Sequence, residues 1–160
     1  MKILFVCSGN ICRSPMAASY FRHRAARADL SHIVVDSAGT LGIDGAEASP
    51  EAIEAMAEIG IDLSAHRSRG ITEGDMRTSD MIVVMALHHF EELELRFHGT
   101  TDRIVLLRAF EEGSTPQIGP PDLDDPIGAR IGVYHTQRDL ISGCLDHLAL
   151  HLKHRAGAGA

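Results

Sequence analysis

Short apolar runs recur along the chain and alternate with longer segments in which apolar residues follow a helical period. The runs are rich in β-branched residues, which is typical of strands buried on both faces of a sheet. They predict strands over residues 2–7, 32–36, 81–85 and 103–107. The other segments predict helices over residues 14–29, 50–60, 72–78, 87–97 and 131–154. Because strands and helices alternate, we predict an α/β fold with a parallel sheet covered by helices on both faces.

Capping residues mark the starts of three predicted helices. Ser14 opens the first helix and places Pro15 at its first position, where a missing N–H costs nothing. Ser49 precedes Pro50 in the same way. Thr72, followed three residues later by an aspartate, is typical of a capping box.

Three segments follow neither pattern, namely residues 37–49, 61–70 and 108–130. The last of these is the longest, and it gathers prolines together with Asp122, Asp124 and Asp125. A connection of that length in a compact domain is usually functional or disordered. We therefore expect the chemistry to draw on this segment, although most of its acids are typical of solvated turns.

The loop after the first strand carries the main candidate site. It joins Cys7, at the end of the strand, to Arg13 at the start of the first helix. Such a loop turns successive backbone N–H groups inward at the positive end of a helix and binds anions. Gly9 and Asn10 tolerate the backbone conformations that a tight loop requires.

A thiol in this position is a candidate nucleophile. We expect Cys7 to be partly ionised at neutral pH, because it lies near a helix N-terminus and an arginine. The planar guanidinium of Arg13 can hold two oxygens of a phosphate, and the hydroxyl of Ser14 can donate a hydrogen bond to the sulfur. A buried structural cysteine beside an ordinary helix cap is the alternative, which the full pattern of strand, Cys, five residues, Arg-Ser-Pro and helix disfavours.

Composition narrows the choice of function. The net charge of -7 argues against a nucleic-acid surface, and no apolar run is long enough to span a membrane. The N-terminus does not resemble a signal peptide, and 3 cysteines, an odd number, fit a reducing compartment, so we expect a cytoplasmic protein. The last predicted helix carries His147, His151 and His154, but no carboxylate pattern completes a metal site, and we expect neither metal nor cofactor.

The organisation of the chain is predicted to be simple. No repeat or linker divides the 160 residues, so we expect a single domain, with residues 156–160 as a disordered tail. Nothing in the sequence calls for a dimer, and a monomer is expected.

The sequence Val-Cys-Ser-Gly-Asn-Ile-Cys-Arg-Ser-Pro at residues 6–15 resembles the signature of the low-molecular-weight protein tyrosine phosphatases. The resemblance extends in the family's order over nearly the whole chain, to residues 36–40, 65–69, 80–85 and the Asp125-Pro126 pair. The chain is similar to the bacterial members and lies near the protein arginine phosphatase branch. The resemblance implies a four-stranded sheet of order 2-1-3-4 in a flavodoxin-like three-layer fold.

The resemblance also implies roles for individual residues. Asp125 matches the aspartate that protonates the leaving group. Asp124 is expected, from its residue type alone, to be a solvated turn residue; electrostatic support of its neighbour is the alternative. Cys12 matches a cysteine credited with trapping oxidised Cys7 as a disulfide; a small core residue is the alternative. The phosphate-binding loop then comprises Ser8, Gly9, Asn10, Ile11, Cys12 and Ser14. A polar network beneath it comprises Asn10, Ser14, Ser37 and His66, while Arg67 and Arg69 are read as solvated and Cys144 as core.

The sequence therefore predicts a phosphomonoesterase that forms a phosphocysteine and acts on phosphotyrosine in proteins. Ile11 stands where the arginine phosphatase branch has threonine, and this favours an aryl ester as substrate. Ile127, in contrast, stands where tyrosine phosphatases commonly have an aromatic residue, so binding of the tyrosyl ring is expected to be weaker. A protein arginine phosphatase is the main alternative. A thioredoxin-coupled arsenate reductase is a further alternative, but its redox cycle needs further cysteines, and residues 80–90 contain none. A non-enzymatic phosphate-binding module is the last alternative, and it would not need Asp125.

Overall fold

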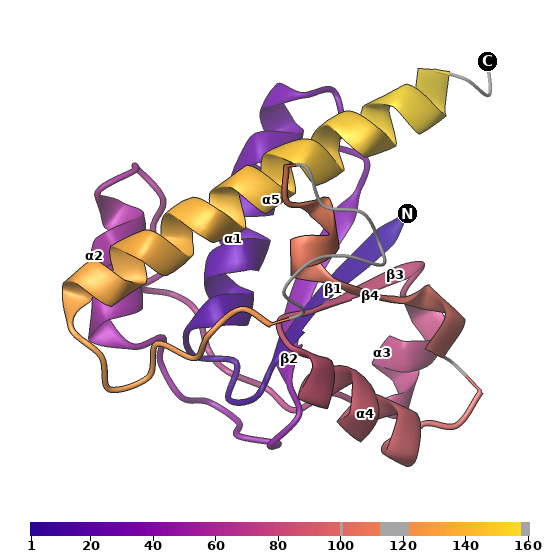
Figure 1. Ribbon diagram of the computed structural model, residues 1–160, viewed down its shortest axis with the longest axis horizontal. Coiled ribbons are helices and arrows are strands. Elements are labelled where there is room, and N and C mark those ends of the chain that lie inside the picture. The colour runs from indigo at the N-terminus through magenta and orange to yellow at the C-terminus, as the bar shows by residue number, and fades with distance from the viewer. Residues whose placement is uncertain (100, 113–121, 158–160) are drawn as a thin grey trace.

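A parallel sheet with helices on both sides is the frame of the structure. The computed structural model describes residues 1–99, 101–112 and 122–157, and Figure 1 follows the chain through its elements. The strands are β1 (Lys2–Cys7), β2 (Val34–Gly39), β3 (Met81–Val84) and β4 (Ile104–Leu106). The helices are α1 (Arg13–Arg27), α2 (Pro50–Ala57), α3 (Glu73–Thr78), α4 (Leu87–Arg96) and α5 (Ile131–Gly157), with short 3-10 turns η1 (Thr101–Arg103) and η2 (Leu107–Phe110).

The four strands lie in the order β2-β1-β3-β4 and pair in parallel, which confirms the predicted fold class. The central strand β1 is flanked on both sides: Leu4 pairs with Asp36 of β2 and with Ile82 of β3. The strand order reverses at β1, because the chain leaves it toward β2 and later returns to its other edge. Ligands in open α/β sheets bind outside the carboxyl ends of the strands at such a point.

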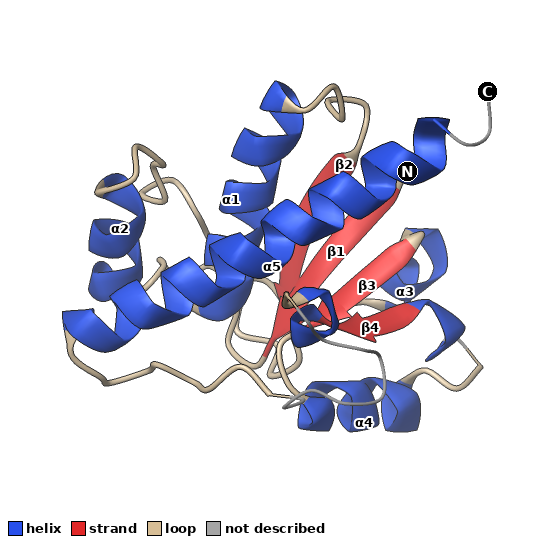
Figure 2. Cartoon of the chain, turned by 45° about the horizontal axis from the view of Figure 1, so that its top comes forward, coloured by secondary structure: helices blue, strands red, loops and turns tan. Residues whose placement is uncertain are grey.

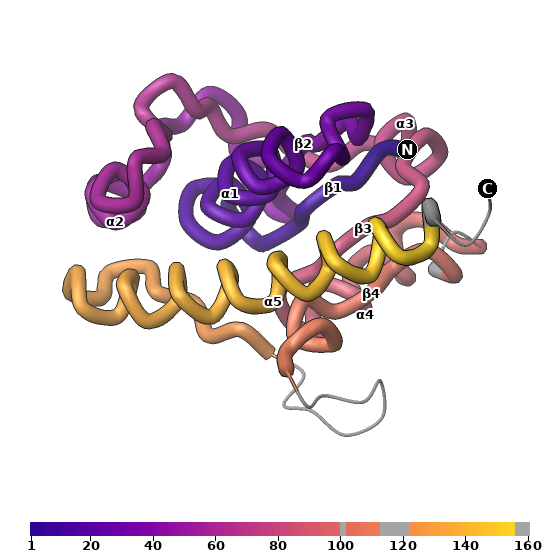
Figure 3. Tube along the Cα trace, turned by 90° about the horizontal axis from the view of Figure 1, so that it is seen from above, coloured from indigo at the N-terminus to yellow at the C-terminus, as the bar shows by residue number. Residues whose placement is uncertain are grey.

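Alternate residues of β1 serve two separate cores. Ile3 and Phe5 pack into the larger core under α1, α2 and α5, whereas Leu4 and Val6 pack into the smaller core under α3 and α4. Figure 2 shows the resulting three layers, and Figure 3 shows α5 running alongside α1 and α2. Because both faces of β1 are buried, its apolar residues are continuous rather than alternating.

Two predicted helix starts are confirmed and one is wrong. The Ser49 hydroxyl accepts a hydrogen bond from the Ala52 amide, and Thr72 forms a reciprocal capping box with Asp75. Helix α1, however, begins at Arg13 with Cys12 as its cap, one residue before the predicted start. The Ser14 hydroxyl does not cap the helix, because it contacts Cys7 and Asn10 instead.

The second strand lies later in the chain than predicted. The pattern predicted residues 32–36, but β2 continues through Ser37 and Ala38 to Gly39, which pair with the last three residues of β1. Because these residues are small or polar, the sequence predicted a loop here, but they form a strand because β1 supplies their hydrogen-bond partners. At the other end of the chain, α5 continues to Gly157 through the first two residues of the expected tail, and residues 158–160 lie outside the described residues.

Candidate active site

The loop from Cys7 to Arg13 turns its carbonyl groups away from a central hollow. Five of these carbonyls accept hydrogen bonds from groups outside the loop: Cys7 from the Thr40 amide, Ser8 from the Leu41 amide, Asn10 from the His66 ring, Ile11 from the Ser49 amide and Cys12 from the Met16 amide. With the carbonyls fixed outward, the amide N–H groups of the loop face inward. This arrangement is a cradle for an anion at the start of a helix.

A close approach between the loop and β2 explains Gly39. A Cβ atom at Gly39 would lie 2.5 Å from the Ser8 carbonyl oxygen and 3.0 Å from the Asn10 nitrogen. Any side chain there would push the loop away from the sheet. Gly39 belongs to the segment 36–40 that resembles the family, and the structure supplies the steric reason for a glycine there.

Asn10 holds the loop in a strained conformation. Its φ angle of 56° lies in the left-handed region, which costs free energy for any residue other than glycine. The Asn10 amide compensates by donating to the hydroxyls of Ser14 at 2.8 Å and Ser37 at 3.0 Å. Its side-chain oxygen accepts from the Arg69 backbone N–H at 3.0 Å. The structure thus brings together Ser14 and Ser37 around Asn10, as the resemblance implied.

His66 binds the same residue from the other side. Its Nε2 lies 2.7 Å from the Asn10 carbonyl oxygen, so Nε2 carries the hydrogen and donates. Burial is the main cause that lowers the pKa of His66 below its usual value. A neutral ring can still make this hydrogen bond.

Arg69 is not solvated, contrary to the expectation from sequence. Its guanidinium forms ion pairs with Asp36 at 2.8 Å and with Asp75 at 2.7 Å, while its backbone holds Asn10. Hydrogen bonds from Arg69 and Thr72 lower the pKa of Asp75 to about 2, against the opposing effect of burial. These charges join the strained loop to β2 and to the capping box of α3. Arg67, by comparison, remains exposed.

The sulfur of Cys7 lies at the base of the cradle. Cys7 is buried, with 2% of its surface exposed, and its Sγ is 2.9 Å from the Ser14 hydroxyl oxygen. The Ser14 oxygen accepts from Asn10, and its hydroxyl hydrogen has two acceptors within reach, the sulfur at 2.9 Å and the Ala38 carbonyl oxygen at 3.5 Å, of which the sulfur is the nearer. Ser14 is thus placed to donate a hydrogen bond to the sulfur.

Arg13 and Asp125 meet across the cavity from opposite ends of the sequence. Arg13 donates from one nitrogen to the Leu123 carbonyl at 3.0 Å and from another to Asp125 at 2.8 Å. Its third nitrogen, Nε, is buried and has no partner among residues 1–99, 101–112 and 122–157. An unpaired buried N–H is costly, and an oxygen of a bound anion would satisfy it.

The segment that carries Asp125 is fastened to the sheet. Asp122 accepts a hydrogen bond at 2.6 Å from the first amide of α4, and the Leu123 amide donates to the Met85 carbonyl. Asp122 therefore caps a helix rather than acting as a solvated turn residue. Asp124 and Asp125 are both exposed, and Asp125 also accepts from the Ile127 amide. Of the segment predicted as irregular over residues 108–130, residues 108–110 belong to η2, and residues 113–121, which include Pro116, Pro120 and Pro121, lie outside the described residues.

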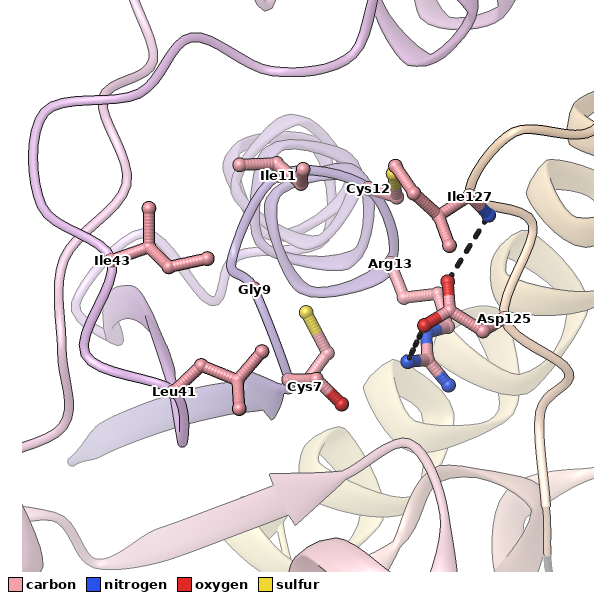
Figure 4. A pocket seen from close by; sticks show the side chains of 10 residues that line it. Cys7, Gly9, Ile11, Cys12, Arg13, Leu41, Ile43, Asp125 and Ile127 are labelled. Carbon is pink, nitrogen blue, oxygen red and sulfur yellow. Dashed lines mark hydrogen bonds and ion pairs between the residues drawn. The ribbon is translucent and has the colours of Figure 1, made fainter.

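These residues surround a cavity of about 190 Å³. In Figure 4, Cys7 lies in the middle, Leu41 and Ile43 lie on one side, and Asp125 and Ile127 lie on the other. Ile11 stands on the loop above Cys7. The base of the cavity is therefore charged and polar, and its mouth is aliphatic, with no aromatic residue among the described residues that line it.

Cys12 lines the same cavity but makes its contacts on the core side. Its Sγ lies 3.3 Å from the hydroxyl oxygens of Ser49 and Tyr134, and only 3% of the residue is exposed. Burial raises the pKa of the Cys12 thiol. Cys12 is therefore a core residue and also a neighbour of the cavity. Cys144 is buried in the core beneath α5.

Sequence reasoning missed three contributors to the site. Leu41 and Ile43 lie in a glycine-rich segment that gave no sign of lining a cavity. His89 is buried in α4 with its Nε2 2.8 Å from the Ser8 hydroxyl oxygen, and no local pattern separates it from an ordinary helical residue.

Among the described residues, no three His, Cys, Asp or Glu side chains come together as metal ligands would. None of the described helices is long and apolar enough to cross a bilayer.

Comparison with known proteins places the chain among phosphatases. The sequence profile of the family described as "Low molecular weight phosphotyrosine protein phosphatase" matches residues 2–157. A "Protein-arginine-phosphatase" of Bacillus subtilis (strain 168) is 36% identical over 153 residues, covering 96% of this chain and 97% of that protein. A "Probable low molecular weight protein-tyrosine-phosphatase EpsP" of Ralstonia solanacearum is 37% identical over 144 residues, covering 90% of each.

The solved structures agree with these relatives. The structure titled "YwlE arginine phosphatase - C7S mutant with phosphorylated active site serine" superposes with a TM-score of 0.88 at 35% identity, covering 96% of each chain. The fold described above is therefore shared over almost the full length of both chains.

Proposed function

The chain belongs to the low molecular weight phosphotyrosine protein phosphatase family, and on that premise we propose that it is a metal-free phosphomonoesterase acting on phosphotyrosine in proteins. The observation that carries the proposal is the cavity in which Cys7, Arg13 and Asp125 meet beneath an aliphatic mouth. Each of the two chemical steps has a group in place for it.

The first step transfers the phosphoryl group to sulfur. The thiolate of Cys7 attacks phosphorus, an S–P bond forms, and the P–O bond to the tyrosyl oxygen breaks. Arg13 and the inward amides hold the other three oxygens, on which negative charge is spread. Protonated Asp125 gives its proton to the departing oxygen, which would otherwise leave as a high-energy anion.

The second step releases phosphate. Asp125, now a carboxylate, takes a proton from water, and the water oxygen attacks phosphorus while the S–P bond breaks. The products are orthophosphate and the Cys7 thiolate, which the Ser14 hydroxyl stabilises at 2.9 Å. A stabilised thiolate is the better leaving group, so Ser14 assists this step in particular.

The ion pair between Arg13 and Asp125 has a consequence for the order of events. In the free protein, Arg13 holds the Asp125 carboxylate at 2.8 Å. A phosphate ester that enters the cradle competes for the same guanidinium. Its binding therefore releases the Asp125 carboxyl from Arg13, so that this group becomes free to face the departing oxygen.

The lining of the mouth favours an aryl ester. Ile11, Leu41, Ile43 and Ile127 present methyl and methylene groups to whatever carries the phosphate. A tyrosyl ring buries apolar surface against them, whereas a guanidinium would lose hydrogen bonds to water without replacement. The exposed Ile127 supplies apolar surface but no stacking partner, so binding of the ring is expected to be weaker than against an aromatic wall.

The second candidate function is hydrolysis of phosphoarginine in proteins. It is favoured by the 36% identity to the Bacillus subtilis protein named for that activity. The deciding measurement is kcat/KM on two peptides of one sequence that carry phosphotyrosine or phosphoarginine. A higher value for the phosphotyrosyl peptide supports our proposal, and a higher value for the phosphoarginyl peptide replaces it with the second function.

Replacing Ile11 by threonine is expected to shift this preference toward phosphoarginine by about 10-fold. The threonine hydroxyl offers the polar group near phosphorus a hydrogen bond that isoleucine denies, and one such contact changes discrimination by about 10- to 200-fold. The measurement is the ratio of kcat/KM for the two peptides in each variant. Ile59→Thr, at an exposed isoleucine outside the cavity lining, is the matched control. An unchanged ratio in Ile11→Thr would remove Ile11 from the determinants of specificity.

Mild peroxide is expected to inactivate the protein reversibly through a Cys7–Cys12 disulfide. Oxidised Cys7 becomes a sulfenic acid, and the Cys12 sulfur displaces its hydroxyl as water. Because burial raises the pKa of Cys12, the attacking thiolate becomes more abundant as pH rises. Disulfide formation should therefore be faster at about pH 8.5 than at about pH 6.5.

Peptide mapping after peroxide treatment, followed by recovery of activity with a dithiol, measures this protection. In Cys12→Ser, inactivation should become irreversible as Cys7 proceeds to sulfinic and sulfonic acids. If the wild-type protein reaches those acids while the Cys12 thiol is still free, Cys12 is only a core residue.

A further inference from the structure

His89 reaches the phosphate loop from a helix on the opposite side of the sheet from α1. It is the third residue of α4 and is fully buried, with 0% of its surface exposed. Its Nε2 lies 2.8 Å from the hydroxyl oxygen of Ser8. Ser8 follows the nucleophile directly and lines the cavity. The hydrogen bond thus joins a buried ring to a hydroxyl one residue from the reacting sulfur.

The surroundings of His89 determine which ring nitrogen carries the hydrogen. Its Nδ1 is buried and finds no partner in the part of the chain that the structure describes. A buried N–H without an acceptor is rarer and costlier than a buried acceptor without a donor. The favoured tautomer therefore keeps the hydrogen on Nε2, which donates it to the Ser8 oxygen.

The ring stays neutral over the range in which a phosphatase is assayed. Burial is the main cause that lowers the pKa of His89 to about 3, and the nearby charges of His88 and Arg13 act in the same direction. A neutral Nε2–H tautomer offers Ser8 a donor and no acceptor on that side. The hydroxyl hydrogen of Ser8 must therefore find its acceptor elsewhere.

We propose that His89 is a positioning residue that presents the Ser8 hydroxyl as a hydrogen-bond donor to an oxygen of the bound phosphate ester. The inference rests on the proposed function, to which it adds a donor besides the loop amides and Arg13. Ser8 lines the cavity with Cys7, so an ester held over the sulfur supplies the acceptor. His89 acts only through Ser8, since its own Nε2–H is committed to that oxygen.

The test compares Ser8→Ala, His89→Leu and His89→Gln with the double variant Ser8→Ala/His89→Leu. The readouts are kcat/KM on an aryl phosphate and the inhibition constant of orthophosphate. A lost hydrogen bond to a charged oxygen should lower kcat/KM by about 10- to 100-fold and raise the inhibition constant in the same direction. Ser8→Ala and His89→Leu should show similar losses, and the double variant should be no worse than the poorer single one.

Rescue by glutamine separates positioning from packing. The amide of His89→Gln can donate at the place of Nε2, so this variant should retain kcat/KM within about threefold of wild type. If His89→Leu does not fold, His89→Asn takes its place, because its shorter amide ends before the Ser8 hydroxyl. Controls for unspecific damage are Ser19→Ala and His147→Leu, which remove a hydrogen-bonded hydroxyl and a hydrogen-bonded ring outside the cavity lining.

Three results would overturn the inference. The first is that Ser8→Ala keeps kcat/KM and the inhibition constant of orthophosphate within about twofold of wild type. The second is that the losses of the two single variants multiply in the double variant. The third is that His89→Gln folds but does not retain kcat/KM. A wild-type protein that hydrolyses no aryl phosphate would instead contradict the proposed function. Calorimetric binding of orthophosphate to wild type and to Ser8→Ala would still test the hydroxyl donor in that case.

Discussion

Cys7→Ser is expected to lower turnover of aryl phosphates by about 10⁴-fold or more while orthophosphate still binds. The sulfur is the atom that forms the covalent bond, and a serine hydroxyl at the same place stays protonated where a thiol ionises. The loop amides, Arg13 and the Asn10 contacts do not depend on the sulfur. The cradle should therefore survive the substitution, and phosphate binding should change by less than about threefold.

Turnover and calorimetric phosphate binding together decide this prediction. Cys144→Ser, the same change at a buried cysteine of α5 outside the cavity lining, is the control and should retain turnover. Substantial activity in Cys7→Ser would rule out the covalent mechanism. Loss of phosphate binding together with activity would mean that the variant had lost the cradle.

Asp125→Asn is expected to slow hydrolysis of esters with poor leaving groups by about 10²- to 10³-fold. A phenol of high pKa leaves as an anion only with difficulty, so it needs the proton of Asp125. A strongly activated phenol leaves readily as its anion, and its release should slow by less than about 10-fold. Rates of the first step for two aryl phosphates of different leaving-group pKa measure the difference.

The ion pair in the free protein gives this variant a second signature. Asparagine cannot compete as an anion for the Arg13 guanidinium, which the carboxylate contacts at 2.8 Å. The inhibition constant of orthophosphate should therefore stay the same or fall, in contrast to its rise in Ser8→Ala. Asp124→Asn, next to it and exposed, is the control. A larger loss in Asp124→Asn, or equal losses on both esters, would assign the acid elsewhere.

Local sequence patterns predicted the parts of the fold that depend on near neighbours. The apolar run at residues 2–7 is confirmed as β1. It could be predicted because a strand that is buried on both faces consists of consecutive apolar residues. The end of β2 was missed, because Ser37 and Gly39 are strand only by pairing with β1. Gly39 is small for a steric reason that lies in the loop it touches rather than in its own segment.

The site was predicted to the extent that its groups have a local reason to be there. Cys7, Arg13 and the cradle follow from a strand, a tight loop and a helix start. The contact between Ser8 and His89 joins residues 81 positions apart, and no periodicity in α4 marks His89 as part of a cavity. Arg69 read as solvated for the same reason, since its partners Asp36 and Asp75 come from two other elements.

The strand order has a consequence for how the protein becomes active during its synthesis. The nucleophile leaves the ribosome with β1, but β1 is central and needs both β2 and β3 beside it. Arg13 and Asp125 are separated by 112 positions, so at about 5–20 residues per second the acid is added about 6 to 20 s after the arginine. A nascent chain therefore carries the Cys7 thiol for several seconds before the Asp125 carboxyl, which the proposed mechanism requires, has been added.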